Sequence, residues 1–338
     1  MRTVDELERM LATPSAGLVA DMGELEGDVL VLGAAGKLGP SLVRLAANAV
    51  AEAGSGARVT AVSRFSTPGS AERLQAAGAA TLVADLTDEA ALADLPDSAN
   101  VVFLVGAKFG SDGNEAGTWH TNTYLPGRVA ERFASSRIVA LSTGNVYPLV
   151  ATDDGGSREG DAPGPVGEYA MSCLGRERVL EAMSRRHSTP VSLIRLNYAV
   201  EMRYGVLVDL AQQILAEEPI DITTSHVNLV WQGYANEVTL RALRRADSPP
   251  FVLNVTGADT LRVHDLALAL GQRLGRDVTF VGSEAPTALL SDASRCHDRY
   301  GYPAFDVDEL VDLTAHWIAD GGEVHGKPTK FQRRDGKF

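Results

Sequence analysis

The sequence predicts an α/β protein built on a doubly wound parallel sheet, with a smaller α/β lobe in its C-terminal half. Two observations carry this prediction. From Asp28 onward, short β-branched runs alternate with Ala/Leu-rich amphipathic stretches, the pattern of repeated strand–helix–strand units. A glycine-rich segment, Gly33 to Gly39, directly follows the first of these runs and opens an amphipathic stretch.

The predicted strands and helices follow in order along the chain. Continuous apolar runs, typical of strands buried in a parallel sheet, occur at 28–32, 58–62, 81–83, 101–105, 138–141 and 191–196. Helix-like stretches such as 40–53 separate them. The later elements are a helix at 204–216, a strand at 227–231, a helix at 236–246, a strand at 251–255 and a helix at 263–274.

These elements predict a division of the chain. We expect an N-terminal extension at 1–27 and a sheet domain at 28–198 that is completed by 227–258. We expect a substrate lobe at 199–226 and 259–320, followed by a basic tail at 321–338. The Gly-rich, locally basic tail is either an ordered arm or lid or a disordered end, and we favour the arm.

Composition favours a compact soluble enzyme. Of the 338 residues, 45% are hydrophobic and 22% charged, and no apolar run reaches the roughly 20 residues of a membrane helix. The net charge of −13 opposes binding to nucleic acid. Acidic residues are spread through the N-terminal segment, unlike a signal peptide, so we expect a cytoplasmic protein. Cys173 and Cys296 lack metal-ligand spacing, and we expect no metal.

The glycine-rich segment predicts a dinucleotide-binding turn of the Rossmann type. Gly33 allows a tight turn, and Gly36 lets a diphosphate approach the backbone at a helix N-terminus. Gly39 allows the helix to pack closely on the strand, and Lys37 and Leu38 complete the turn. An ordinary strand–helix turn is the alternative.

The GxxGxxG spacing resembles that of the extended short-chain dehydrogenases/reductases, the family of NAD-dependent epimerases and dehydratases. The resemblance covers roughly residues 28–320 and implies a nicotinamide dinucleotide cofactor. Ser63 and Arg64 end the second predicted strand, where an NAD enzyme usually places an acid. Because an arginine suits a 2′-phosphate, NADP is expected over NAD, with a solvated surface arginine as the alternative.

The resemblance alone implies further cofactor contacts. Asp85 and Leu86 resemble the pair at the adenine, and Val105 and Lys108 resemble the loop after the fourth strand. Asn122 resembles the asparagine beneath the nicotinamide ribose, although a solvated helix residue is an equal alternative.

The resemblance also implies a catalytic pair. Thr143 lies at the end of a predicted strand, and Tyr169 follows it by 26 positions, a separation similar to the family's. In the implied chemistry, Tyr169 exchanges a proton with a carbinol or carbonyl oxygen that the Thr143 hydroxyl orients, while hydride moves to or from the nicotinamide.

The chain departs from the family four positions after the tyrosine, where Cys173 replaces a lysine. That lysine normally lowers the tyrosine's pKa and holds the nicotinamide ribose. Its loss penalises a base mechanism more than a reduction, in which Tyr169 acts as an acid. We expect Arg176, two helical turns after Tyr169, or Lys108 to supply the cation, and Cys173 to be a small packed residue.

The substrate side is less distinct. By resemblance, Asn197, Arg203, Asn228 and Gln232 are candidate polar contacts to a polyhydroxylated small molecule, a nucleotide-sugar among the options; each has an equal alternative as a surface or turn residue. Gly144 and Asn145 occupy the place of a dehydratase's acid pair, which argues against dehydration. The resemblance implies an oxidoreductase or epimerase that forms a homodimer. The alternative function is a catalytically silent dinucleotide-binding sensor or subunit.

Overall fold

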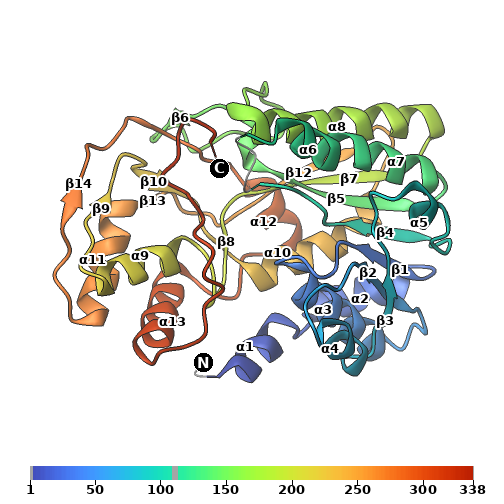
Figure 1. The fold of residues 1–338 in the computed structure, drawn as a ribbon, viewed down its shortest axis with the longest axis horizontal. Helices are drawn as coiled ribbons and strands as arrows, with labels where there is room; N and C mark the ends of the chain where they lie inside the picture. The colour runs from blue at the N-terminus through green and yellow to red at the C-terminus, as the bar shows by residue number, and fades with distance from the viewer. Residues whose placement is uncertain (1–2, 109–112, 338) are drawn as a thin grey trace.

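A single seven-stranded sheet forms the centre of the protein (Figure 1). The computed structural model describes residues 3–108 and 113–337. The strands lie in the order β12-β7-β5-β4-β1-β2-β3, and every neighbouring pair is parallel. The predicted doubly wound parallel sheet is confirmed. Its strands are β1 (Val29–Leu32), β2 (Val59–Ser63), β3 (Ala80–Val83), β4 (Asn100–Phe103), β5 (Arg137–Thr143), β7 (Val191–Leu196) and β12 (Phe251–Val255).

Both faces of the sheet are buried except at its edge strand β3, which explains the continuous apolar runs of the inner strands. Successive side chains of a strand point to opposite faces. In β1, Val29 and Val31 accordingly pack into one apolar core, whereas Leu30 and Leu32 pack into the other. A strand covered on only one face would alternate apolar with polar residues.

Helices cover the two faces (Figure 1). One face carries α3 and α10, and the other carries α7 and α8. The helices of the first 187 residues are α1 (Val4–Leu11), α2 (Ala16–Glu24), α3 (Gly39–Ala53), α4 (Ser70–Ala76), α5 (Glu89–Ala93), α6 (Glu115–Trp119), a π-helical turn (His120–Tyr124), α7 (Leu125–Arg132), a 3₁₀ turn (Gly144–Val146) and α8 (Gly167–His187).

The N-terminal extension folds onto the sheet domain. Thr3 and Glu6 form a capping box that starts α1. Leu7 of α1 and Leu18 of α2 are fully buried in the same core as α3. The extension is therefore part of the globular fold.

The second half of the chain supplies a lobe beside the sheet. The helices of this half are α9 (Val206–Leu215), α10 (Gln232–Arg241), a 3₁₀ turn (Ala242–Arg245), α11 (Val263–Leu274), α12 (Ser294–Tyr300) and α13 (Val307–Ala319). Of these, α10 covers the sheet, whereas α9, α11 and α13 pack together in the lobe. Short strands outside the central sheet form four two-stranded sheets: β6 (Val150–Ala151) with β15 (Thr287–Ala288), β8 (Ala199–Val200) with β11 (Val230–Trp231), β9 (Ile220–Asp221) with β14 (Phe280–Val281), and β10 (His226–Val227) with β13 (Leu261–Arg262).

The predicted strand at 227–231 is two short strands, and neither joins the large sheet. Between them, the Asn228 side chain donates to the Asp259 carbonyl at 2.9 Å and accepts from the Ser291 amide at 2.9 Å, so it ties together loops rather than strands. From 227–258 only β12 enters the sheet. The division of the chain into two domains stays a prediction.

The tail from residue 321 packs on its own chain as an ordered arm over the described part, to residue 337. Phe331 is 2% exposed, and the Arg334 guanidinium donates to the Thr287 carbonyl at 2.6 Å. Figure 1 shows the tail running from α13 past α9 to end near β6.

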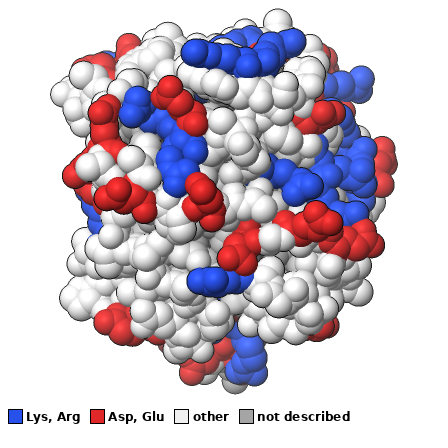
Figure 2. All heavy atoms as spheres, turned by 90° about the vertical axis from the view of Figure 1, so that its right-hand side faces the viewer, with Lys and Arg blue, Asp and Glu red and all other residues white. Residues whose placement is uncertain are grey.

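The surface carries charges of both signs. Figure 2 shows acidic and basic side chains interspersed over the face at the right of Figure 1. Among the described residues, no helix has both the length and the apolar character needed to cross a membrane.

Candidate active site

A cleft of about 430 Å³ opens at the carboxyl ends of β1 and β4, where the strand order reverses, the usual ligand position in a doubly wound sheet. It brings together residues that lie far apart in the sequence. The predicted site residues that line it are Gly33, Gly36, Lys37, Leu38, Gly39, Lys108, Thr143, Tyr169, Arg176, Asn197 and Gln232.

The glycine turn leaves no room for side chains. Gly33 has φ +87°, and a Cβ there would lie 2.8 Å from a Val105 methyl carbon. At Gly39 a Cβ would lie 2.2 Å from the Ala34 carbonyl oxygen. The turn therefore requires glycine at both positions, as the sequence predicts.

The residues present fit a dinucleotide. A Cβ at Gly36 would meet only the Gly33 carbonyl oxygen, at 3.2 Å, so a bare stretch of backbone faces the cleft. Leu38 caps α3 without a side-chain hydrogen bond, which leaves the helix N-terminus uncovered by side chains and suited to a phosphate. Within the described part of the chain, the buried Oε1 of Gln232 accepts no hydrogen bond, so it can receive one from a ligand.

Thr143 and Tyr169 meet in the same cleft. Thr143 ends β5, and its hydroxyl oxygen accepts from the Asn145 backbone amide at 3.2 Å and the Asn145 side-chain amide at 3.0 Å. Tyr169, in the first turn of α8, forms a side-chain hydrogen bond with Thr143. The predicted phenol–hydroxyl pair is therefore assembled in space.

The tyrosine is held in its neutral form. Burial raises the pKa of Tyr169 far above its ordinary value, the neighbouring Cys173 raises it further, and Arg176 opposes the shift. Cys173 is 1% exposed and packs with Val146 and Tyr147, as the prediction of a packed residue requires. At neutral pH the phenol can donate a proton but is a poor base.

Arg176 and Asn122 form a buried clamp behind the pair. The Arg176 guanidinium donates to the carbonyl of Leu141 and, at 3.1 and 2.9 Å, to the carbonyl and Oδ1 of Asn122. Asn122 also exchanges two hydrogen bonds of 2.8 Å with the backbone of Ala107. The clamp fixes the loop after β4 against β5, so both side chains already have structural partners.

Lys108, on the loop after β4, also lies near the tyrosine. Its Nζ lies 6.0 Å from the centroid of the Tyr169 ring. Burial lowers the pKa of Lys108 to about 8. The lysine can therefore place a positive charge near Tyr169 that Cys173 cannot supply.

Five further residues predicted to contact the cofactor lie outside the cleft lining: four lie at or just after the ends of β2 and β3 near the sheet edge, and Val105 follows the central β4. Arg64 and Asp85 follow β2 and β3 and form an exposed ion pair at 3.9 Å. Ser63 is the last residue of β2, Leu86 is buried in the core, and Val105 packs against Gly33. Their roles stay predictions.

Two of the expected substrate contacts are buried in structural interactions away from the cleft. Arg203 pairs with Glu201 at 3.0 Å and also with Glu8. Asn228, 2% exposed, ties together two loops. Asn197 and Gln232 do line the cleft.

Sequence reasoning missed part of the cleft wall. Tyr198, Tyr204, Lys327 and Thr329 also line it. The basic composition of the tail was the one available signal for the last two, and it did not show where the tail packs.

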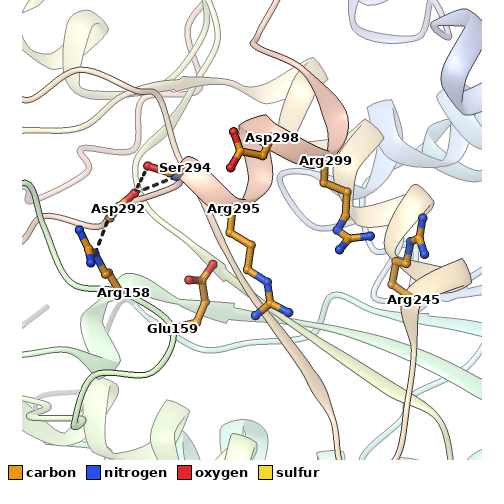
Figure 3. Close-up of a pocket in the computed structure, with 8 residues that line it drawn as sticks. All are labelled: Arg158, Glu159, Arg245, Asp292, Ser294, Arg295, Asp298 and Arg299. Atoms are coloured by element: carbon orange, nitrogen blue, oxygen red, sulfur yellow. Dashed lines mark hydrogen bonds and ion pairs between the residues drawn. The ribbon is translucent and has the colours of Figure 1, made fainter.

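A second cavity, of about 680 Å³, lies beside α12 and holds none of the predicted site residues (Figure 3). Its acids and arginines largely belong to the surface: Arg158 binds Asp292 at 3.1 Å, and Arg295 and Arg299 lie over the Phe251 ring. Among the described residues, no group of three or more His, Cys, Asp or Glu side chains is placed to hold a metal ion.

Comparison with known proteins identifies the family. The model of the NAD dependent epimerase/dehydratase family matches residues 29–225, more than half of the chain. The chain belongs to this family. The resemblance drawn from the glycine turn and the Thr143–Tyr169 spacing is confirmed, and with it the class of NAD-dependent enzymes.

Solved structures share the fold at low sequence identity. UDP-glucose 4-epimerase from Thermotoga maritima has a TM-score of 0.72 at 19% identity, over 87% of this chain and 99% of that one. MoeE5 in complex with UDP-glucuronic acid and NAD scores 0.69 at 21% identity, over 87% and 100%. UDP-glucuronic acid 4-epimerase from Bacillus cereus, in complex with NAD, scores 0.70 at 19% identity, over 86% and 98%. No curated protein sequence matches this chain.

Proposed function

We propose that this member of the epimerase/dehydratase family reduces a carbonyl group of a nucleotide-activated sugar by hydride transfer. One observation carries the proposal: a neutral tyrosine, Tyr169, is hydrogen-bonded to Thr143 in the same cleft as the bare glycine turn. A pure binding module has no use for that pair.

The chain's own residues position the substrate and move the proton. The Thr143 hydroxyl holds the substrate's carbonyl oxygen beside the Tyr169 phenol, and Tyr169 donates its proton to that oxygen as it becomes an alkoxide. Asn145 fixes the Thr143 oxygen from two sides. A bound reduced nicotinamide supplies the hydride. The proton lost from Tyr169 is replaced from solvent.

Reduction is favoured over oxidation because of the tyrosine's environment. Taking a proton from an alcohol requires a phenolate, which burial beside Cys173 disfavours. Lys108, with its lowered pKa, is the nearest replacement for the family's lysine. Arg176 contributes a second, buried positive charge, although its guanidinium is already used by the backbone.

The substrate class and the cofactor are the finer parts of the proposal. The structures of similar fold that act on UDP-sugars make a nucleotide-sugar the first substrate to test. Asn197 and Gln232 are the polar contacts proposed for it. Arg64, with its side chain 73% exposed at the end of β2, supports NADP over NAD, whereas the similar structures carry NAD.

The second candidate is a catalytically silent dinucleotide-binding sensor or subunit. Cys173 in the place of the lysine favours it, because that lysine assists proton transfer. A Tyr169→Phe variant separates the two functions. The enzyme requires the phenol, whereas a sensor keeps its activity in the cell without it.

Mass spectrometry and fluorescence titration of the purified protein test the proposal. We expect exchangeable NADPH or NADH and consumption of the reduced cofactor with a keto form of a UDP-sugar. Tightly bound NAD that copurifies would point to an internal oxidation–reduction cycle, as in an epimerase, and would contradict the reductase. Failure to bind any nicotinamide dinucleotide would overturn the proposed function.

We further propose a homodimer in the cytoplasm. The face formed by α6, the π-helical turn and α8 exposes Trp119 and Tyr124, by 37% and 49%, beside Val179 and Met183. Tyr124→Asp is expected to convert a dimer to a monomer in light scattering. A wild-type monomer at micromolar concentration would contradict the dimer. The cytoplasmic location stays a prediction from the N-terminal composition.

A further inference from the structure

The last residues of the chain form one wall of the cleft. Residues 323–337, the C-terminal strap, leave the lobe beside Arg203, whose carbonyl accepts from the His325 amide at 3.0 Å. At the far end, Gly336 packs against the backbone of Val166 and Gly167, next to the first turn of α8 that carries Tyr169. The strap thus crosses from the lobe to the sheet domain (Figure 1).

A buried anchor fixes the middle of the strap. The amide and hydroxyl of Thr329 donate to a carboxylate oxygen of Asp209 on α9, at 2.8 and 2.5 Å. The Thr329 carbonyl accepts from Nζ of Lys108 at 3.3 Å. Phe331, two residues on, is buried in the main core. These contacts hold the strap in one path across the cleft.

The strap brings a third lysine to a cleft that already holds two. Lys37 of the glycine turn has its Nζ 2.9 Å from the centroid of the Tyr204 ring. Lys108 lies on the loop after β4, and Lys327 on the strap lines the same cleft. In a chain of net charge −13, three lysine side chains around one cavity are a marked local concentration of basic groups.

The lysines act on one another. Burial, first, and the positive charges of Lys108 and Lys327 together lower the pKa of Lys37 to about 7, whereas Asp209 and Glu201 oppose the shift. A group with two or more negative charges placed among the lysines would remove this repulsion and be bound by it.

We propose that the C-terminal strap is part of the binding site, and that Lys327, with Lys37 and Lys108, binds the diphosphate of a nucleotide in the cleft. The inference rests on the proposed function and names the group that the site recognises. Lysines bind phosphates as point charges, and the bare backbone at Gly36 lies in the same cleft.

Both the dinucleotide and a nucleotide-sugar contain a diphosphate, so the experiment must separate these two sources. The variant is Lys327→Gln, at an exposed residue that lines the cleft. The matched control is Lys337→Gln, which removes the same charge from an exposed position near the end of the same strap. The probes are NADH, NADPH, UDP and inorganic diphosphate, each titrated by calorimetry.

We expect Lys327→Gln to weaken binding about tenfold, the effect of one charge-assisted contact, and Lys337→Gln to change it less than about twofold. Weaker binding of NADH or NADPH alone assigns the lysines to the cofactor. Weaker binding of UDP alone assigns them to the substrate. Either result supports the inference.

Two results overturn it: affinities that are unchanged in Lys327→Gln for every probe, or an equal loss in Lys337→Gln. Titration with inorganic diphosphate tests the lysine site without any enzyme reaction. If no nucleotide binds but diphosphate binds in a Lys327-dependent way, the proposed function fails and the lysine site stands. If wild-type protein binds neither diphosphate nor nucleotide, both fail.

Discussion

The two walls of the cleft are built in different ways. The sheet wall consists of the glycine turn after β1, Thr143 at the end of β5 and Tyr169 at the start of α8. The opposite wall is made by residues after β7, by α9 and by the C-terminal strap, including Tyr204 and Lys327. The first wall is assembled by neighbouring strands of one sheet, whereas the second depends on contacts between segments outside that sheet, as in Asp209 with Thr329.

The walls also differ in how they are held. Behind the sheet wall, Glu177 and Arg195 form a buried ion pair at 2.7 Å, and Ser142 donates to Glu177 at 2.5 Å. On the opposite wall, the strap is held by hydrogen bonds at Thr329, by the bond from Arg334 to the Thr287 carbonyl and by the packing of Phe331. We infer that the sheet wall is the rigid template for chemistry and that the opposite wall is easier to loosen.

The largest expected effect is the loss of chemistry on the sheet wall. Tyr169→Phe removes the proton donor and is expected to lower turnover at least about 100-fold, while dinucleotide affinity changes less than about twofold. Steady-state kinetics and fluorescence titration measure the two. Tyr302→Phe, at a side chain that is 72% exposed, is the control. Unchanged turnover in Tyr169→Phe would rule out the proposed reductase mechanism.

The next effect tests the rigidity of that wall. Glu177→Gln leaves the Arg195 charge buried without its carboxylate and is expected to lower the free energy of unfolding by about 3 kcal/mol. The matched control on the same helix is Glu181→Gln, which breaks the exposed pair with Arg185 and should change it by less than about 0.5 kcal/mol. Urea unfolding measures both. Equal effects would mean that the buried pair does not stabilise the sheet wall.

A smaller effect is expected on the opposite wall. Thr329→Val removes the hydroxyl's hydrogen bond to the partly buried Asp209 carboxylate and the one it accepts from the Phe331 amide, and should lower stability by about 1 to 2 kcal/mol. Hydrogen exchange should accelerate in residues 323–337 and not in β1 or β5. The exposed Thr260→Val is the control. Equal acceleration throughout the chain would show that the two walls do not open separately.

The smallest expected effect is a pH-dependent gain in stability when Lys37 is replaced. The pKa of Lys37 is lowered from its ordinary 10.5 to about 7, by burial first and then by Lys108 and Lys327, against Asp209 and Glu201. The charged lysine therefore destabilises the folded state fully below pH 7, and this cost fades as the pH rises toward 10.5.

Lys37→Met should therefore be more stable than wild type at pH 6, with a smaller advantage at pH 9. We expect a gain below about 1 kcal/mol, because water in the open cleft screens the charges. Urea unfolding at the two pH values measures it, with the exposed Lys337→Met as control. A stability gain that grows with pH would contradict the lowered pKa of Lys37.

The sequence by itself determined the sheet and the glycine turn, and family spacing predicted that Thr143 and Tyr169 meet. Their signals are local, because a strand buried on both faces must read as an apolar run and a turn with φ +87° at Gly33 needs glycine. The pairing of Thr143 with Tyr169 followed from family spacing, and it fits because β5 and α8 are consecutive large elements of one sheet domain.

Only the tertiary structure decided which polar side chains face the cleft. Arg203 and Asn228 have the same residue types as binding groups, but ion pairs and loop contacts bury them elsewhere. Lys327 is an exposed basic residue of a Gly-rich tail, and nothing local to it specifies a path across the cleft. That path depends on the Asp209–Thr329 bond and the burial of Phe331, contacts whose partners are distant in the sequence and meet only when the chain has folded.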